Sequence, residues 1–253
     1  MKLLTMFRNL GRTATHDRFV YQDYQVRIGI YYLQHIVKPF ADGNKVLDIG
    51  CAEGGVLKVF EQNGYNCTGL EANPERAKYA NQTNPSGIKF ICGSIESFST
   101  DEQFDIILML DVIEHIDEKL PILEKIKQLL LPEGIAVISF PPFRSPFGGH
   151  QQVMKSGLRY IPYVQLFPET VYCWLLEHIE RMNVEIHLGN YQTGITIRQF
   201  EQLVSRAGLN IIKKINYFVR PRQALRFGLK IRQNRLRILQ EYLSTGVTYI
   251  LGS

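Results

Sequence analysis

The chain has 253 residues, of which 45% are hydrophobic and 21% charged, with a net charge of +5. These values are ordinary for one globular α/β domain, and no apolar run approaches the roughly 20 residues that a transmembrane helix needs. The four cysteines are scattered without a CxxC pair. We therefore expect reduced thiols and a cytoplasmic protein without a membrane span.

Residues 1–40 precede the first predicted strand and are expected to form an N-terminal helical cap. The stretches 16–28 and 30–37 have helical character, and Pro39 and Gly43 close the region. The tyrosines of these helices either pack onto the edge of the sheet or line a substrate pocket. They are Tyr21, Tyr24, Tyr31 and Tyr32.

The central stretch of the chain is 45–55, where an apolar run at 46–49 predicts a buried strand and a helix follows from residue 56. Between strand and helix the backbone turns tightly at small residues, namely Gly50, Ala52, Gly54 and Gly55. This is the first half of a βαβ unit, whose loop faces a nucleotide-like ligand at the carboxyl end of the strand. Cys51 inside the loop is expected to be a small space-filler.

A second strand, predicted at 66–70, ends on Glu71, about 20 residues beyond the glycine loop. A carboxylate there can accept hydrogen bonds from both hydroxyls of a ribose. Five further strands are predicted, at 89–92, 104–110, 134–140, 210–219 and 247–251. The alternation with helical patterns predicts a Rossmann-like, mostly parallel, seven-stranded sheet with helices on both faces.

Four blocks, at 46–54, 69–74, 104–116 and 131–137, resemble the motifs of class I S-adenosylmethionine-dependent methyltransferases. The similar branch is the one that includes small-molecule and quinone-biosynthesis enzymes. The blocks follow in family order, and 195–209 is similar to the family's late helix and its turn into strand six. The family's central loop glycine is Ala52 here, which narrows the space for backbone near the ligand.

The resemblance implies roles for the residues around the first two strands. Asp48 would orient the ammonium of the cofactor's methionine end, directly or through water. Gly50, Ala52 and Gly54 would let the backbone pass the carboxypropyl chain and the ribose. Glu71 would hold both ribose hydroxyls.

Further cofactor-binding residues are implied beyond these. Ala72 and Asn73 follow the second strand, and Asn73 would border the adenine together with Ile95. Ser94 would lie near the exocyclic amine of the adenine. The segment of Leu110 and Asp111 would face the sulfonium.

The substrate side is predicted to be a lid inserted at 141–192, dense in proline, glycine and aromatic residues, with a helix at 169–182. Aromatic walls would receive a flat or apolar acceptor. His150, flanked by two glycines, is the candidate base for a hydroxyl acceptor. His115 is a second catalytic candidate, although capping or a supporting position suits it better.

Two other interpretations use the same residues. The loop and Glu71 loosely fit a dinucleotide site, and hence an NAD(P)-dependent oxidoreductase, but Asp48 would repel a pyrophosphate and no Tyr-x-x-x-Lys pair is present. A non-catalytic methyltransferase-like binding module is also open. The spacing of Asp111, Glu114 and His115 would let their side chains share one helix face, as metal ligands could. Metal-free relatives carry the same residue types, so we predict no metal site.

The positive charge concentrates near the end of the chain, at 220–237, and Glu241 is the first acid after it. We predict a helix over 223–243, inserted into the last part of the fold, which spans 193–253. It is either a solvated basic face or a weak contact for an acidic ligand or an anionic membrane surface. Nucleic acid is not expected, because no RNA-binding module accompanies it. The sequence as a whole predicts methyl transfer from S-adenosylmethionine to a small organic acceptor, at a hydroxyl oxygen, by in-line displacement.

Overall fold

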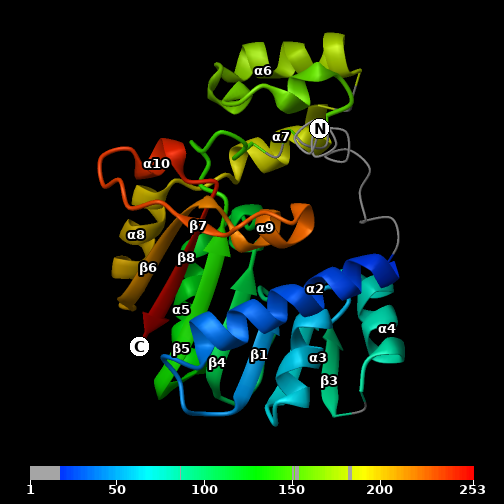
Figure 1. The fold of residues 1–253 in the computed structure, drawn as a ribbon, viewed down its shortest axis with the longest axis vertical. Helices are drawn as coiled ribbons and strands as arrows, with labels where there is room; N and C mark the ends of the chain where they lie inside the picture. The colour runs from blue at the N-terminus through cyan, green and yellow to red at the C-terminus, as the bar shows by residue number, and fades with distance from the viewer. Residues whose placement is uncertain (1–17, 86, 150, 152–153, 182–183) are drawn as a thin grey trace.

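The computed structural model describes residues 18–85, 87–149, 151, 154–181 and 184–253. Within these residues, eight strands form a central twisted sheet in the order β3-β2-β1-β4-β5-β8-β6-β7 (Figure 1). The first five strands in this order are parallel, while β8, β6 and β7 are antiparallel to their neighbours. The strands are β1 (Lys45–Ile49), β2 (Asn66–Glu71), β3 (Ile88–Cys92), β4 (Phe104–Leu110), β5 (Leu130–Phe140), β6 (Asn210–Val219), β7 (Arg232–Gln233) and β8 (Gly246–Gly252).

The Rossmann-like α/β fold predicted from the sequence is confirmed, with one correction. The sheet has eight strands and not seven, because Arg232 and Gln233 pair with the end of β6 as the short edge strand β7. β6 extends to Val219, and without β7 its edge facing away from β8 would be unpaired. The returning chain pairs with this edge as β7.

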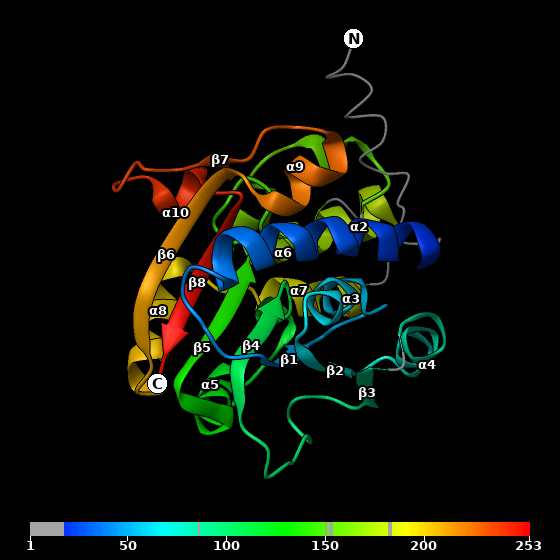
Figure 2. The ribbon, with the colours of Figure 1, turned by 60° about the horizontal axis from the view of Figure 1, so that its bottom comes forward.

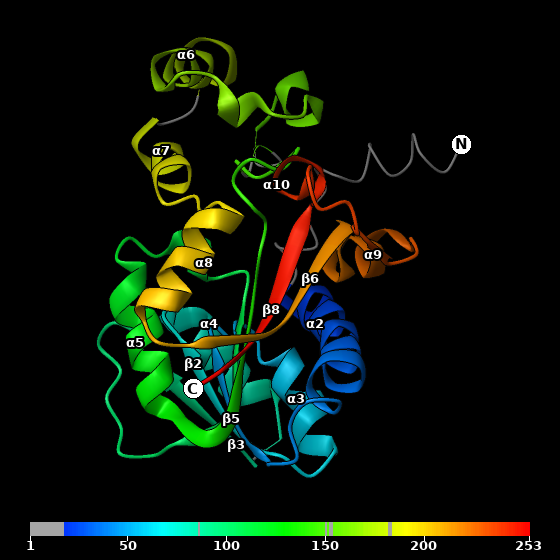
Figure 3. The ribbon, with the colours of Figure 1, turned by 90° about the vertical axis from the view of Figure 1, so that its left-hand side faces the viewer.

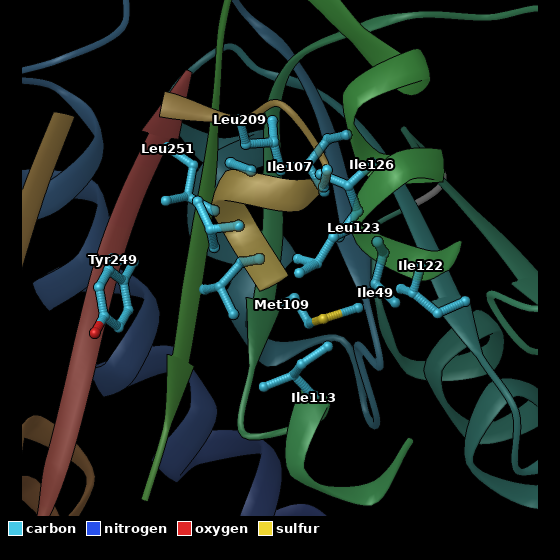
Figure 4. Packing of buried hydrophobic residues seen from close by; sticks show 14 of the residues in the cluster. Ile49, Ile107, Met109, Ile113, Ile122, Leu123, Ile126, Leu209, Tyr249 and Leu251 are labelled. Atoms are coloured by element: carbon cyan, nitrogen blue, oxygen red, sulfur yellow. The ribbon is translucent and has the colours of Figure 1, made fainter. Parts of the chain in front are cut away.

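Helices cover both faces of the sheet, as Figures 2 and 3 show. One face packs against α2 (Arg18–Tyr32), the π-helical turn η1 (Leu33–Val37) and α3 (Gly55–Gln62), and α4 (Pro74–Thr83) lies beside β2 and β3. The other face packs against α5 (Lys119–Leu129) and α8 (Ile197–Arg206), and Figure 4 shows this core. Alternate side chains of a strand enter opposite cores, so Val46 and Leu47 are both buried, on different faces.

The described part of the N-terminal cap is one helical segment, since α2 continues directly into η1. Two of its tyrosines pack against the sheet. The hydroxyl of Tyr32 lies 3.3 Å from the hydroxyl of Thr248 on β8, and that of Tyr31 lies 3.2 Å from that of Tyr217 on β6. These two rings therefore anchor the cap on the sheet rather than stand open to a substrate.

The described residues between 141 and 192 extend beyond the carboxyl ends of the parallel strands (Figures 1 and 3). They contain the short turns η4 (Gly157–Tyr160) and η5 (Val164–Leu166), then α6 (Glu169–Leu175), η6 (Leu176–Glu180) and α7 (Val184–Gln192). This region has a small core of its own, made by Met154, Val164, Tyr172 and Leu176. The buried carboxylate of Glu180 accepts hydrogen bonds from the backbone N–H groups of Lys155 and Ser156 and from the Ser156 hydroxyl.

The prediction of one helix over 223–243 is wrong. Instead the chain forms α9 (Pro221–Phe227), β7, an irregular segment and α10 (Gln240–Leu243). Gly228 takes a left-handed conformation at φ +64° and ends α9. Further along, the Asn234 N–H donates to the Asn216 carbonyl of β6 at 2.7 Å, which holds this part of the chain beside the sheet. Within the described part of the chain, no helix is long and apolar enough to cross a membrane.

Candidate active site

The loop after β1 is fixed to the neighbouring strand by its own backbone. The N–H groups of Gly50 and Cys51 both donate to the Leu70 carbonyl, at 2.8 and 3.1 Å. Gly50, Ala52 and Gly54 have positive φ angles of 77°, 50° and 76°. A side chain at Gly50 would also place its Cβ 2.4 Å from a methyl of Val112, so glycine is required there.

Glu71, at the tip of β2, joins two loops. One oxygen of its carboxylate accepts from the Ala52 N–H and the other from the Asn73 N–H, both at 2.8 Å. The residue is buried. A carboxylate has about four lone-pair sites, so each oxygen keeps the capacity for one more hydrogen bond. That remaining capacity matches the two hydroxyls of a ribose.

Asp48 lies near the end of β1 and is almost completely buried. Burial, with a smaller contribution from the negative charge of Glu71, raises the pKa of its carboxyl to about 8. A cationic group beside it would favour its ionised form. The site therefore has an acid suited to the ammonium of an amino-acid ligand.

The end of β4 carries an ion-pair cluster that the sequence did not reveal. Asp111 has a φ of +58°, and its carboxylate accepts from Arg220 at 2.9 Å and from Arg222 at 2.5 Å. Arg222 also donates to the Tyr21 hydroxyl at 3.1 Å, and its carbonyl accepts from the Tyr24 hydroxyl at 2.7 Å. Strand β4, the start of α9 and helix α2 meet at this point.

The profile of a methyltransferase domain family matches residues 23–214 of the chain. The chain belongs to the class I S-adenosylmethionine-dependent methyltransferases. S-Adenosylmethionine is its cofactor, and the carboxylates of Glu71 and Asp48 fit the ribose and the amino-acid end of that molecule. The interpretation as an NAD(P)-dependent oxidoreductase is thereby set aside.

Among similar curated proteins are the ubiquinone biosynthesis O-methyltransferases of Rickettsia typhi and Rickettsia prowazekii. The methyltransferase is 31% identical to each over 114 residues, which is 43% of this chain and 46% and 45% of those proteins. The chain thus spans less than half of the length of these relatives.

Solved structures with the same fold include the plantazolicin methyltransferase BpumL in complex with SAH. It matches with a TM-score of 0.56 at 18% identity and covers 98% of this chain and 89% of its own. A possible histamine N-methyltransferase from Thermotoga maritima matches with a TM-score of 0.57 at 14% identity, covering 98% and 99%.

Two glutamines on α2 hydrogen-bond to the backbone of the loop at 50–55, which we name the cofactor loop. Gln25 donates to the Cys51 carbonyl at 3.1 Å and accepts from the Gly55 N–H at 3.3 Å, and Gln22 donates to the Glu53 carbonyl at 2.9 Å. Both glutamines are buried. The only sequence signal for them is two amides three residues apart, on one face of the predicted cap helix.

The residues predicted around the adenine occupy ordinary loop positions. Asn73 caps α4, because its side-chain oxygen accepts from the N–H groups of Glu75 and Arg76, and Ala72 beside it is exposed. Ile95 is buried in the core, and the Ser94 hydroxyl lies 3.3 Å from that of Ser97. Their contacts with the cofactor remain predictions. Cys51 is buried within the loop, as expected for a space-filler.

The two histidine candidates stay untested. His150 lies outside the described residues, and His115 is exposed at the end of the 3₁₀ turn η2 (Ile113–His115). Burial and the charge of Asp111 raise the pKa of the neighbouring Glu114 carboxyl to about 8. Within the described residues, no group of three or more His, Cys, Asp or Glu side chains could hold a metal ion. Both oxygens of Asp111 accept from arginines, which disfavours a cation there.

Proposed function

We propose that this methyltransferase moves the methyl group of S-adenosylmethionine to a hydroxyl oxygen of a small organic acceptor. The Rickettsia relatives are named O-methyltransferases, which supports oxygen as the target. We also propose a single domain that comprises the cap (1–40), the cofactor-binding core (45–140), a lid (141–192) and the rest of the sheet (193–253). The aromatic residues of the lid suit a flat or apolar acceptor.

The single observation that best supports the proposed cofactor site is how the carboxylate of Glu71 is fixed in place. Its carboxylate is held by one N–H from each of the two loops that border the site. Fixed in this way, it offers the ribose a preorganised acceptor pair that loses little freedom on binding. Leu110 ends β4 and Asp111 follows it at the same edge of the sheet, where we place the sulfonium end of the cofactor.

Bound S-adenosylmethionine supplies a methyl group that its sulfonium already activates. The residues of the chain therefore have to align the acceptor in line with the sulfur and remove the hydroxyl proton. We assign proton removal to His150, since an imidazole can accept a proton near neutral pH. His115 is the second candidate for this role.

Calorimetry with S-adenosylhomocysteine tests the cofactor site. Replacing Glu71 with alanine removes two charge-assisted hydrogen bonds to the ribose, so we expect an affinity loss of about 100-fold or more. Glu71→Gln, which keeps an acceptor oxygen, should lose less. The control is Glu124→Ala, because Glu124 is exposed on α5. Unchanged affinity in Glu71→Ala would overturn the assignment.

An acceptor panel tests the reaction. Phenols and catechols are offered beside amines and thiols, and methyl transfer is followed with labelled cofactor. We expect transfer to hydroxyl acceptors, with kcat reduced by about 100-fold in His150→Ala and unaffected in His178→Ala, a change at an exposed lid histidine. Preference for amines would contradict the oxygen target. Tight cofactor binding without any transfer would favour a non-catalytic binding module.

A further inference from the structure

The segment 228–243, which we name the basic insertion, lies between α9 and β8 and has an unusual surface. No aspartate or glutamate occurs between Glu201 and Glu241, while lysine and arginine recur throughout this stretch. Within the basic insertion the exposed cations are Lys230, Arg232, Arg235 and Arg237. Its single acid, Glu241, uses both carboxylate oxygens to accept from the Ile197 N–H at the start of α8, so its charge is engaged within the fold.

Large apolar side chains alternate with these cations. Ile238 is 94% exposed and Leu236 is 52% exposed, and Leu229, Leu239 and Tyr242 are exposed as well. Placing an isoleucine almost fully in water gives up the favourable free energy of burying it. The combination of exposed arginines and aliphatic side chains is the chemistry by which proteins bind the surface of anionic bilayers, where cations meet headgroups and apolar side chains enter the acyl boundary.

The basic insertion is held in place and is not a loose tail. Asn234 is buried, and besides its backbone bond to Asn216 its amide donates to the Ser244 hydroxyl at 3.0 Å. The side-chain oxygen of Asn234 accepts from the Leu236 N–H at 3.0 Å. The exposed apolar residues that follow are therefore presented on a fixed support, which lowers the ordering cost of docking.

The lid exposes a second apolar surface at the same end of the molecule, where α6 and α10 both lie beyond the parallel strands (Figures 1 and 3). A hydrogen bond connects the two regions, since the Tyr163 hydroxyl donates to the Tyr242 carbonyl at 3.0 Å. Trp174 is 52% exposed, and it is joined by Ile161, Phe167, Val171 and Ile179. Tryptophan is enriched where proteins meet the headgroup region of membranes.

We propose that the basic insertion docks the methyltransferase on an anionic phospholipid bilayer, with the lid surface as the adjoining apolar contact. This proposal does not depend on the nature of the methyl acceptor. Lipid fits better than nucleic acid, because Leu236, Ile238 and Leu239 are aliphatic and have no ring on which a base could stack. The strongly basic sequence, whose one acid is engaged within the fold, selects anionic over neutral lipid.

Vesicle co-sedimentation of the full chain tests the docking. The probes are vesicles of phosphatidylcholine alone and vesicles with about one third phosphatidylserine, at low and high salt. We expect binding to the anionic vesicles, weakened by salt, and at least tenfold weaker binding to neutral ones. The double variant Arg235→Ala/Arg237→Ala should weaken anionic binding by about thirtyfold, given the roughly fivefold effect of each surface cation.

The apolar part is tested with a matched pair of variants. Ile238→Ser should weaken vesicle binding by about tenfold, whereas Ile212→Ser, at an exposed isoleucine of β6, should not change it. S-Adenosylhomocysteine affinity, which should be equal in all variants, shows that each is folded and separates this test from that of the cofactor site. Equal loss in both isoleucine variants, or no preference for anionic vesicles, would overturn the proposal. So would tighter binding to a single-stranded RNA that is insensitive to Ile238→Ser.

Discussion

The two ends of the active-site region are built in opposite ways. Around the cofactor loop, buried polar side chains meet backbone groups: Glu71, Gln22 and Gln25 each satisfy N–H or carbonyl groups of the loops. At the other end, a hydrogen bond between Tyr163 and Tyr242 joins the lid to the basic insertion, and both regions leave large apolar side chains in water. This difference fits the two proposals above. The fixed half binds the cofactor, and the exposed apolar surface of the second half contacts an acceptor or a membrane.

The cluster of Asp111 with Arg220 and Arg222 joins the end of β4 to the start of α9, which leads into the basic insertion, and removing its acid should have the largest effect. Asp111→Ala leaves two partly buried guanidinium groups without their carboxylate. We expect a loss of about 2 kcal/mol in the free energy of unfolding, below the full value for buried pairs because Arg222 is partly exposed. Denaturant unfolding measures it. Asp101→Ala, at an exposed position, is the control, and equal stability of the two variants would contradict the bridging role.

The fixed half is tested through α2. Gln25→Ala leaves the Cys51 carbonyl and the Gly55 N–H without their partner in a buried place, which costs about 1–3 kcal/mol. Part of this should appear as a roughly tenfold loss of S-adenosylhomocysteine affinity, because the loop loses its support from behind. Gln34→Ala, at an exposed glutamine of η1, should leave affinity unchanged. If Gln25→Ala binds the cofactor product as tightly as the native protein, the loop does not need α2.

The sequence predicted the strands and the loop of the fixed half better than the elements of the other half. A strand, a glycine loop and an acid at the next strand end are local patterns, so spacing alone singled out Glu71, whereas the role expected of Asp48 came from the resemblance to the family. Gln25 was missed because its partners lie about thirty residues further along the chain. The basic segment was predicted to be one helix because its leucines recur near one helical face. In the structure, Gly228 ends the first helix and Asn234 pairs with β6, so the chain does not continue as a helix. Arg220 and Arg222 meet Asp111 only through the sheet topology.

The pH dependence of cofactor-product binding offers a further test of the fixed half. With a pKa of about 8, the Asp48 carboxyl binds a proton at neutral pH in the cofactor-free protein, and the ammonium of the cofactor favours its ionised form. Binding therefore releases a proton, so affinity for S-adenosylhomocysteine should rise as pH increases from 6 to about 8 and then level off. Calorimetry in buffers of different ionisation enthalpy measures the proton released. Asp48→Asn should bind more weakly at pH 8 and show a flatter profile; a profile as steep as the native one would assign the proton elsewhere.

The smallest effect is expected at Ala52, the position where the family has glycine. Its φ of +50° places a Cβ in the left-handed region, which costs roughly 1 kcal/mol for a residue other than glycine. Ala52→Gly relieves this strain but adds freedom to the unfolded chain, so the two changes nearly offset each other in the free energy of unfolding. Removing the methyl of Ala52, whose N–H donates to the Glu71 carboxylate, should instead raise cofactor-product affinity by up to about threefold. A clear loss of affinity would mean that this methyl packs against the ligand, and that the departure from glycine is itself part of the binding surface.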